Sequence, residues 1–383
     1  MFGKRRVYLD CAAGAVGNPS SPHEEGRRAR HMLEDARAVI ARLVEVQKDD
    51  VIFTSGATEA NALAILGHVH ARRLLAGADT PGRNNMHVLY LPSAHASLVE
   101  NVNMLAEEGV DIEALPIREY RVDTEALAKL IRPETVFVAM EAVCGETGVV
   151  WNTREVAEVL RAARAGRAGA RIMLHVDASQ APLTEKITRD HFGADLLTFD
   201  ASKVGPIHGC GVLVAHRTIP IAPLYLGGGQ ERGLRPGTES PFLARNFAAA
   251  LYAAAAGREA FRATALRGRT RLVAAITASI PDVLIQEGRR QAPNILSLSL
   301  IGRDSDYLVA LLDEDGFAVS TRSACETDSE EGSRAVHTLT GDTERARATL
   351  RVSWNLDTRG RDLARFAEAL RRAVTFVDSG RRK

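Results

Sequence analysis

Short apolar runs alternate with helix-like patterns through the first two thirds of this 383-residue chain. Apolar runs that end in or lead to polar residues stand at 51–54, 87–93, 135–140, 171–180 and 196–199. Helix-like stretches lie between or before them, such as 24–45, whose apolar residues recur on one face, and 152–165. This alternation predicts an α/β fold in which helices cover both faces of a mainly parallel sheet.

The last third of the chain has a different pattern. A long Ala-rich stretch, 241–277, is predicted to be a helix that links to a second, smaller α/β unit. That unit would contain strands near 294–300 and 349–354 and a terminal helix. We therefore expect two domains, a large one at 13–250 and a small one formed by 1–12 and 251–383.

Polar residues follow several of the predicted strands. In a parallel sheet, ligands bind beyond the carboxyl ends of the strands, so residues at these points should converge. The residues in question are Thr58, His95, Glu146, Asp177, Gln180 and Lys203.

Lys203 lies in a tight corner between two apolar runs, 196–199 and 210–215. A lysine held between buried segments is unfavourable unless it is paired or chemically used, although an ordinary surface lysine on a turn is the commoner case. Asp177 precedes it by 26 residues, at the end of another apolar run. A lysine Schiff base to pyridoxal phosphate, with an aspartate that keeps the pyridine nitrogen protonated, is one chemistry that needs both groups. From spacing alone, Asp177 could equally be a helix cap.

The segment before the helix predicted near residue 58 suits a phosphate. Thr58 is a plausible helix N-cap, and the backbone N–H groups of Gly56, Ala57 and Thr58 would point at a ligand. The G-x-x-x-x-G-K pattern of a Walker loop is absent. His95 follows a predicted strand, where it could act as an acid or base, stack on a cofactor, or serve structure alone.

Charge and composition exclude several classes of function. The chain has 49 Lys and Arg against 48 Asp and Glu, so nothing indicates binding to nucleic acid or to a membrane surface. No apolar run is long enough to span a bilayer, and no signal-peptide core is present. His68 and His70 face apart on a helix and do not predict a metal site.

Cysteine usage predicts a cytoplasmic protein. Cys11, Cys144, Cys210 and Cys325 are scattered without a C-x-x-C pair, which argues against disulfides or structural zinc. Cys325 is distinctive because it lies in a polar segment that we expect to be mobile, whereas most free cysteines are buried. Its acidic neighbours would oppose formation of the thiolate.

Taken together, these motifs resemble the cysteine desulfurases of the class V aminotransferase group, which have fold type I. The resemblance covers nearly the whole chain, in family order. It is carried by YLDCAA, GNPSSPH, IFTSGATEANALAI, ETGVV, HVDASQ, the lysine segment, LGGGQERGLRPGTES, STRSACETDSEEGS and LRVSW.

The resemblance implies a fold type I transferase with a mainly parallel seven-stranded sheet and pyridoxal 5'-phosphate as cofactor. Lys203 would form the Schiff base, Asp177 would pair with the pyridine nitrogen and Gln180 with the ring hydroxyl. His95 would stack on the ring, while Ala57, Thr58 and Ser202 would lie at the phosphate.

For the substrate, the resemblance implies that Arg351 binds the carboxylate of L-cysteine. Cys325 would take the sulfur as a persulfide, leaving alanine, and its segment has the longer form found where the sulfur passes to a separate acceptor protein. Thr238 would reach the phosphate of a partner subunit, which implies a homodimer.

The chain departs from the family pattern near the cofactor. Asp200 stands where a phosphate-binding Ser is usual, and its charge should repel phosphate unless it points away. Ser202 replaces a usual His, and Cys144-Gly145 replaces a segment that supplies an Asn to the ring hydroxyl. A helical insert between YLDCAAGAV and GNPSSPH is also missing. We therefore expect weakened affinity for the cofactor.

Two other functions stay open from the sequence. A related enzyme could use the same cofactor for another elimination, with Cys325 dispensable. A pseudoenzyme that has lost its cofactor could act as a binding partner. The sequence does not identify the sulfur acceptor, which could serve iron–sulfur assembly, tRNA or DNA thiolation, or biosynthesis.

Overall fold

A seven-stranded sheet forms the centre of the larger part of the molecule in the computed structural model, which describes residues 6–14, 17–76, 85–165, 171–321 and 332–381. Its strand order is β1-β9-β8-β7-β6-β2-β3. The strands are β1 (Val51–Thr54), β2 (His87–Tyr90), β3 (Asp111–Ala114), β6 (Thr135–Glu141), β7 (Met173–Asp177), β8 (Leu196–Asp200) and β9 (Gly211–Ala215). Only β9 pairs antiparallel with its neighbours, so the predicted mainly parallel sheet of seven strands is confirmed.

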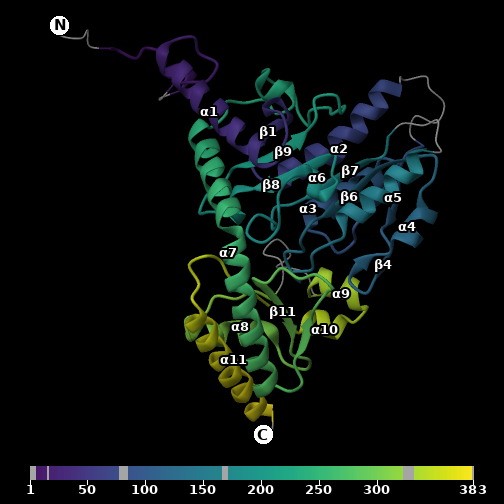
Figure 1. The fold of residues 1–383 in the computed structure, drawn as a ribbon, viewed down its shortest axis with the longest axis vertical. Coiled ribbons are helices and arrows are strands. Elements are labelled where there is room, and N and C mark those ends of the chain that lie inside the picture. Colours follow the sequence, from purple (N-terminus) through teal and green to yellow (C-terminus); the bar gives the residue numbers. More distant parts are fainter. Residues whose placement is uncertain (1–5, 15–16, 77–84, 166–170, 322–331, 382–383) are drawn as a thin grey trace.

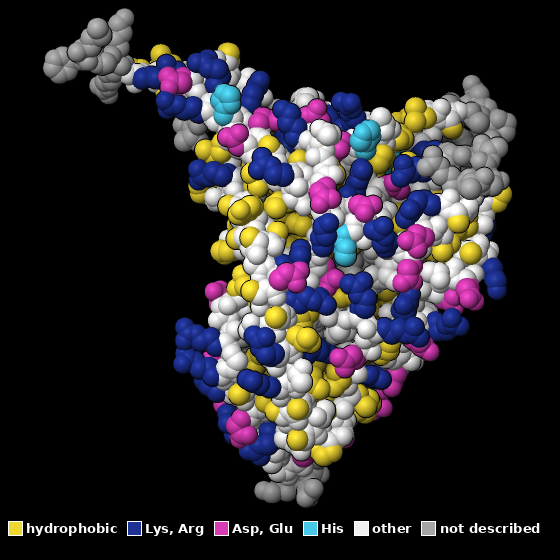
Figure 2. All heavy atoms as spheres, viewed as in Figure 1, with side chains coloured by type: hydrophobic (Ala, Val, Ile, Leu, Met, Phe, Trp, Pro, Cys, Tyr) yellow, Lys and Arg dark blue, Asp and Glu magenta, His cyan; other side chains and the backbone are white. Residues whose placement is uncertain are grey.

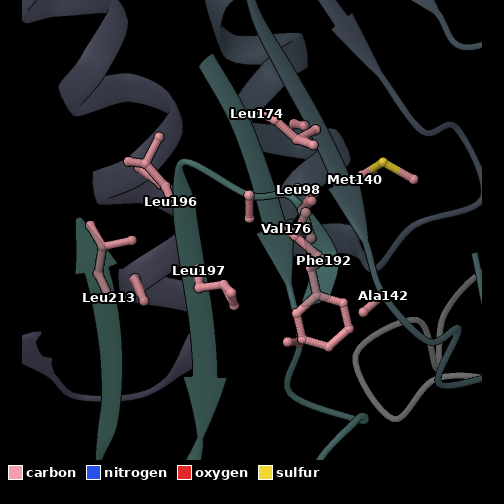
Figure 3. Close-up of a cluster of buried hydrophobic side chains, with 14 of the residues drawn as sticks. Leu98, Met140, Ala142, Leu174, Val176, Phe192, Leu196, Leu197 and Leu213 are labelled. Atoms are coloured by element: carbon pink, nitrogen blue, oxygen red, sulfur yellow. The ribbon is translucent and has the colours of Figure 1, made fainter. Parts of the chain in front are cut away.

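Helices cover the sheet, as Figure 1 shows. They are α1 (Glu24–Leu43), α2 (Ala57–Ala76), α3 (Ala96–Glu107), α4 (Thr124–Leu130), α5 (Thr153–Ala165) and α6 (Arg189–Phe192), and a two-stranded ribbon of β4 (Ile117–Arg118) and β5 (Arg121–Val122) lies near α4. The strands β6, β7 and β9 are buried on both sides, which is why they read as continuous apolar runs. Figure 3 shows part of this core, with side chains of neighbouring strands packed together.

A three-stranded antiparallel sheet, β10-β11-β12, organises the smaller part. Its elements are β10 (Leu284–Gln286), β11 (Ile295–Ser299), α8 (Ser305–Glu314), α9 (Arg334–Thr340), α10 (Thr343–Arg347), β12 (Thr349–Ser353) and α11 (Gly360–Arg381). A second hydrophobic core lies here, separate from the core around the large sheet.

One long helix, α7 (Pro241–Ser279), belongs to both parts (Figure 1). Ser240 caps its first turn and Pro241 occupies the position where a missing N–H does no harm. Phe247 and Leu251 are buried in the first core, whereas Phe261 and Leu272 are buried in the second. The domain boundary expected at residue 250 therefore falls within a continuous helix, and it stays a prediction.

The N-terminal segment lies with the large part. His23, at the start of α1, contacts Asp10, and Arg6 pairs with Glu25. Figure 1 shows this end of the chain far from α8 and α11, so residues 6–12 do not join the small unit within this chain as the sequence suggested. No helix in the described ranges is both long and apolar enough to cross a membrane.

Candidate active site

A cavity of about 890 Å³ lies where the two parts of the molecule meet. The large part contributes residues that follow β2, β6, β7 and β8, and the small part contributes residues of β11, β12 and the turn after β12. Its charged and polar lining residues include His95, Glu141, Glu146, Gln180, Ser202, Lys203 and Arg351. Four of the six polar residues that the sequence predicts to converge at the carboxyl ends of the strands line this one cavity, namely His95, Glu146, Gln180 and Lys203.

Lys203 stands at the end of a short 3-10 turn, Ala201–Lys203, directly after β8. Because β8 and β9 are paired antiparallel and buried, the turn between them is held from both sides. The lysine side chain faces the cavity and is exposed. An amine at this place is open to a carbonyl ligand that enters the cavity.

Asp177 is buried at the end of β7, with 7% of its surface exposed. Its carboxylate accepts hydrogen bonds from the Ser179 N–H at 2.9 Å and from the Asn61 side chain at 2.8 Å. Asn61 lies fully buried on α2, and its amide also bonds the Ser97 hydroxyl at 2.8 Å. This chain of contacts joins Asp177 to the start of α3.

His95 caps α3 and completes that network. Its Nδ1 accepts the backbone N–H of Ser97 at 3.1 Å and lies 2.9 Å from the Ser97 hydroxyl. Since Nδ1 is an acceptor here, the ring proton of neutral His95 is on Nε2. Burial lowers the pKa of His95, and the nearby charges of Asp177 and Lys203 act in opposite directions. His95 is therefore a neutral imidazole near pH 7.

A buried acid, Glu141, was missed by the sequence reasoning. It is the last residue of β6 and pairs in register with Asp177 of β7. Burial first, and then the charge of Asp177, raise the pKa of Glu141 well above its ordinary value. Its Oε1 has no hydrogen-bond partner among the described residues. The available signal was a polar residue at the end of the apolar run 135–140. Cys144, also buried, has its thiol pKa raised by burial and by Glu141.

Arg351 on β12 closes the cavity from the small part. Its Nη1 donates to the Gly145 carbonyl at 3.3 Å, and its backbone pairs with Ser320. The side-chain amide of Gln180 lies over Gly145, where an added Cβ would be 3.1 Å from Gln180 Nε2. Gln180 thus occupies space that a larger residue at position 145 would need.

Asp200 does not point away from the start of α2. Its Oδ2 accepts the Ala57 N–H at 2.8 Å, and its Oδ1 accepts both the N–H and the hydroxyl of Ser202, at 2.8 and 2.6 Å. The helix begins at Ala57, so the prediction that Thr58 is the N-cap is wrong: the carboxylate of Asp200 makes the capping contact. Thr58 itself is exposed and lies outside the cavity lining.

Thr238 is not in the main cavity. Thr238 lines a separate pocket of about 160 Å³ with Gly209 and Cys210, and its hydroxyl lies 3.4 Å from the Asn18 amide. Its expected contact with a partner subunit stays a prediction. Cys325 lies outside the described residues.

Comparison with known proteins identifies the family. The model of the class-V aminotransferases matches residues 6–366. This chain belongs to the class-V aminotransferase family.

Curated members of the class-V family resemble the chain over nearly its full length. Cysteine desulfurase IscS 1 of Archaeoglobus fulgidus is 30% identical over 357 residues, which cover 92% of this chain and 88% of that protein. The putative cysteine desulfurase IscS 1 of Bacillus subtilis is 29% identical, with 92% and 94% covered.

Solved structures show the same class-V fold. DndA from Streptomyces lividans superposes with a TM-score of 0.72 at 30% identity, covering 90% of this chain and 94% of that one. A NifS-like protein gives a TM-score of 0.84 at 24% identity, with 96% and 93% covered, and supports the fold alone. The fold type I architecture expected from the sequence is confirmed.

Proposed function

We propose that this protein is a pyridoxal-phosphate-dependent cysteine desulfurase, which converts L-cysteine to L-alanine and takes the sulfur as a persulfide on Cys325. The observation that carries the proposal is the meeting of Lys203, His95, Gln180 and Arg351 in one cavity, with the buried Asp177 joined to His95 by hydrogen bonds through Asn61 and Ser97. The relatives named cysteine desulfurase support the same activity.

The residues present suit the ring of the cofactor. An accessible amine at Lys203, a buried carboxylate at Asp177 and an amide at Gln180 are the groups that a pyridine aldehyde with a ring hydroxyl requires. Bound there, pyridoxal phosphate supplies an electron sink for heterolytic cleavage at the substrate Cα. The phosphate end fits less well, because Asp200 holds donors that a phosphate would use.

The chain's own residues supply substrate binding and proton transfer. The Arg351 guanidinium faces the cavity, and it can bind the carboxylate of cysteine with two parallel hydrogen bonds. His95 presents its Nε2 proton as a neutral imidazole and can exchange a proton with the substrate. Cys325 forms an S–S bond with the substrate sulfur as the C–S bond breaks, and a proton goes to the carbon that becomes the methyl group of alanine.

Both ends of the segment that carries Cys325 are fixed to the cavity wall. Ser320 pairs with the backbone of Arg351, and the Ser333 hydroxyl donates to Glu146 at 2.5 Å. Cys325 is five residues from Ser320, a span of at most about 18 Å of extended chain. These anchors support the proposal that the thiol reaches the substrate.

Replacing Cys325 tests the activity. Cys325→Ala should abolish alanine formation from L-cysteine and the persulfide mass increment of 32 Da (about one sulfur atom), whereas the exposed Cys11 can be replaced by Ala as a matched control with activity retained. Alanine formation that persists in Cys325→Ala would instead support the alternative elimination enzyme.

The pseudoenzyme alternative has one observation in its favour, the carboxylate of Asp200 at the phosphate position. Absorbance tests this alternative. After addition of pyridoxal phosphate, an active enzyme should show the aldimine absorption band, and borohydride should fix the cofactor covalently to Lys203. Lys203→Ala should show neither property. A wild-type protein that takes up no cofactor would support the pseudoenzyme.

We also propose a cytoplasmic homodimer that passes sulfur to an acceptor protein. Figure 2 shows hydrophobic side chains gathered over α1 and α7, where Met32, Val39 and Tyr252 line an apolar groove. Leu226 of the glycine-rich segment is 90% exposed, and a second copy packed against it would remove this apolar surface from water. Light scattering should give twice the mass of 41.4 kDa, and Leu226→Asp should favour the monomer.

A further inference from the structure

Asp200 and Ser202, the two unusual neighbours of Lys203, form one hydrogen-bonded unit at the start of α2. Oδ1 of Asp200 accepts two bonds from Ser202, and Oδ2 accepts one from Ala57. The same three donors, two backbone N–H groups and a hydroxyl, are what an anionic group of a ligand would need there. The internal carboxylate already satisfies them.

The carboxylate is also close to the backbone of the helix start. An added Cβ at Gly56 would lie 3.3 Å from Asp200 Oδ2. The carboxylate thus lies against the positive end of a 20-residue helix, where a negative charge is stabilised.

Asp200 brings negative charge without a neutralising cation. In the described part of the chain, the hydrogen bonds of the Asp200 carboxylate come from Ala57 and Ser202, and no Lys or Arg forms an ion pair with it. A phosphate that approached the start of α2 would have to displace the carboxylate or tolerate repulsion from it at short range. Either event removes the advantage that a phosphate normally gains at a helix N-terminus.

We propose that Asp200 sets the cofactor specificity of this chain, by acting as an internal substitute for the cofactor's phosphate. The site then gains little from the 5'-phosphate, and it binds pyridoxal and pyridoxal phosphate with similar affinity. Ser202 is a positioning residue in this arrangement, because it holds Oδ1 while Oδ2 caps the helix. The inference rests on the proposed function only in taking a pyridoxal-type aldehyde as the ligand.

The test is a pair of titrations of the apo-protein with pyridoxal phosphate and with pyridoxal. Quenching of tryptophan fluorescence is a suitable readout, since Trp354 lines the cavity. The quantity of interest is the ratio of the two dissociation constants. Asp200→Ser, which frees the Ala57 N–H, should shift that ratio by at least tenfold in favour of pyridoxal phosphate. Asp200→Asn, which removes the charge with little change of shape, is the second variant if the first does not fold.

Glu59→Gln is the matched control. Glu59 lies in the first turn of the same helix, but it bonds Ser55, Tyr225 and Arg235 instead of Ala57. Its removal changes the net charge near α2 by the same amount and should leave the ratio within threefold of wild type. A shift below tenfold in the Asp200 variants, or an equal shift in Glu59→Gln, overturns the inference.

Inorganic phosphate separates this inference from the proposed function. Phosphate alone should raise the thermal midpoint of Asp200→Ser and leave that of the wild type unchanged; the same rise in both proteins contradicts the inference. If neither aldehyde binds to any of these proteins, the proposed function fails as well. If both bind and the ratio does not move, the inference alone fails.

Discussion

Arg37 of α1 donates two hydrogen bonds to the buried carboxylate of Glu231, with N–O distances of 2.8 and 2.6 Å. Glu231 also accepts the Phe53 N–H of β1 at 2.8 Å. Glu231 therefore fixes the glycine-rich segment 226–240 to both a helix and an edge strand of the large sheet. Its positive φ of 47° places it in the left-handed region, so contacts of this strength are needed to hold it.

Loss of one partner of this pair should destabilise the fold strongly. Arg37→Ala leaves the Glu231 carboxylate buried and unpaired, and the free energy of unfolding should fall by about 3–5 kcal/mol. Urea denaturation followed by circular dichroism measures the change. Glu34→Ala removes the outer, more exposed ion-pair partner of Arg37 and should change stability by less than about 0.5 kcal/mol. Equal effects of the two substitutions would contradict this account.

Two buried histidines, one on α2 and one on β7, should make the fold sensitive to acid. The rings of His68 and His175 both stack with Phe137, and burial lowers the pKa of each to about 4. Both are neutral in the folded state, whereas in the unfolded chain they protonate near pH 6.5. Between these values the unfolded state binds more protons, so stability is complete above about pH 6.5 and falls as the pH is lowered toward 4. The loss should approach about 3 kcal/mol for each histidine.

Urea denaturation at a series of pH values from 4 to 8 checks this expectation. His175→Gln keeps a donor for the Thr198 hydroxyl, which lies 3.0 Å from His175 Nε2, and it removes one titrating group. The variant should therefore show about half of the wild-type dependence on pH. An unchanged dependence would show that other groups cause the acid sensitivity.

Asn61 should act on catalysis through His95 and Asp177. Asn61→Ala removes the amide that joins the Asp177 carboxylate to the Ser97 hydroxyl. Each lost hydrogen bond to a charged group is worth about 1.5–3 kcal/mol, so kcat/KM should fall by about ten- to hundredfold. The pH profile of kcat/KM should also shift, because the surroundings of His95 change. A fall in stability without a shifted profile would mean that Asn61 serves structure alone.

Asn101, one turn after Ser97 on α3, provides a matched control for Asn61. Asn101 donates to the Ser97 carbonyl at 2.7 Å, and among the described residues no hydrogen bond joins its side chain to Asp177 or to the Ser97 hydroxyl. Asn101→Ala should therefore change stability modestly and leave both the pH profile and kcat/KM close to wild type.

Arg351→Lys should separate substrate binding from later steps. A lysine keeps the positive charge but cannot present the planar pair of donors that a carboxylate binds. The KM for L-cysteine should rise by about tenfold or more with a smaller change in kcat. Arg345, which bonds Gln286 outside the cavity, is the control for loss of a guanidinium in the small part, and Arg345→Lys should leave KM unchanged. An unchanged KM in Arg351→Lys would place the substrate carboxylate elsewhere.

The sequence predicts the sheet and the location of the site because both depend on local patterns. Apolar runs ending in polar residues are enough to place His95, Gln180 and Lys203 at one edge of a parallel sheet. The direction of the Asp200 carboxylate is different, since it depends on Ala57, which lies 143 residues away in the chain. Glu141 was missed for a related reason. Its burial depends on the neighbouring strand β7, and no local sequence pattern predicts the register of β7 with β6. The resemblance to the family adds roles for the residues of the site. The role given to Ala57 and Ser202 requires that both are free to bind a phosphate.

The continuity of α7 has a consequence for how the molecule denatures. With 39 residues it is about 58 Å long, and its apolar side chains pack into two cores in succession. Truncation of the gene between the two parts would leave half of this helix with its buried face in water, so neither fragment should be soluble alone. Melting of one core should also remove the support of the other, and calorimetry should record a single cooperative transition where the two-part architecture would suggest two.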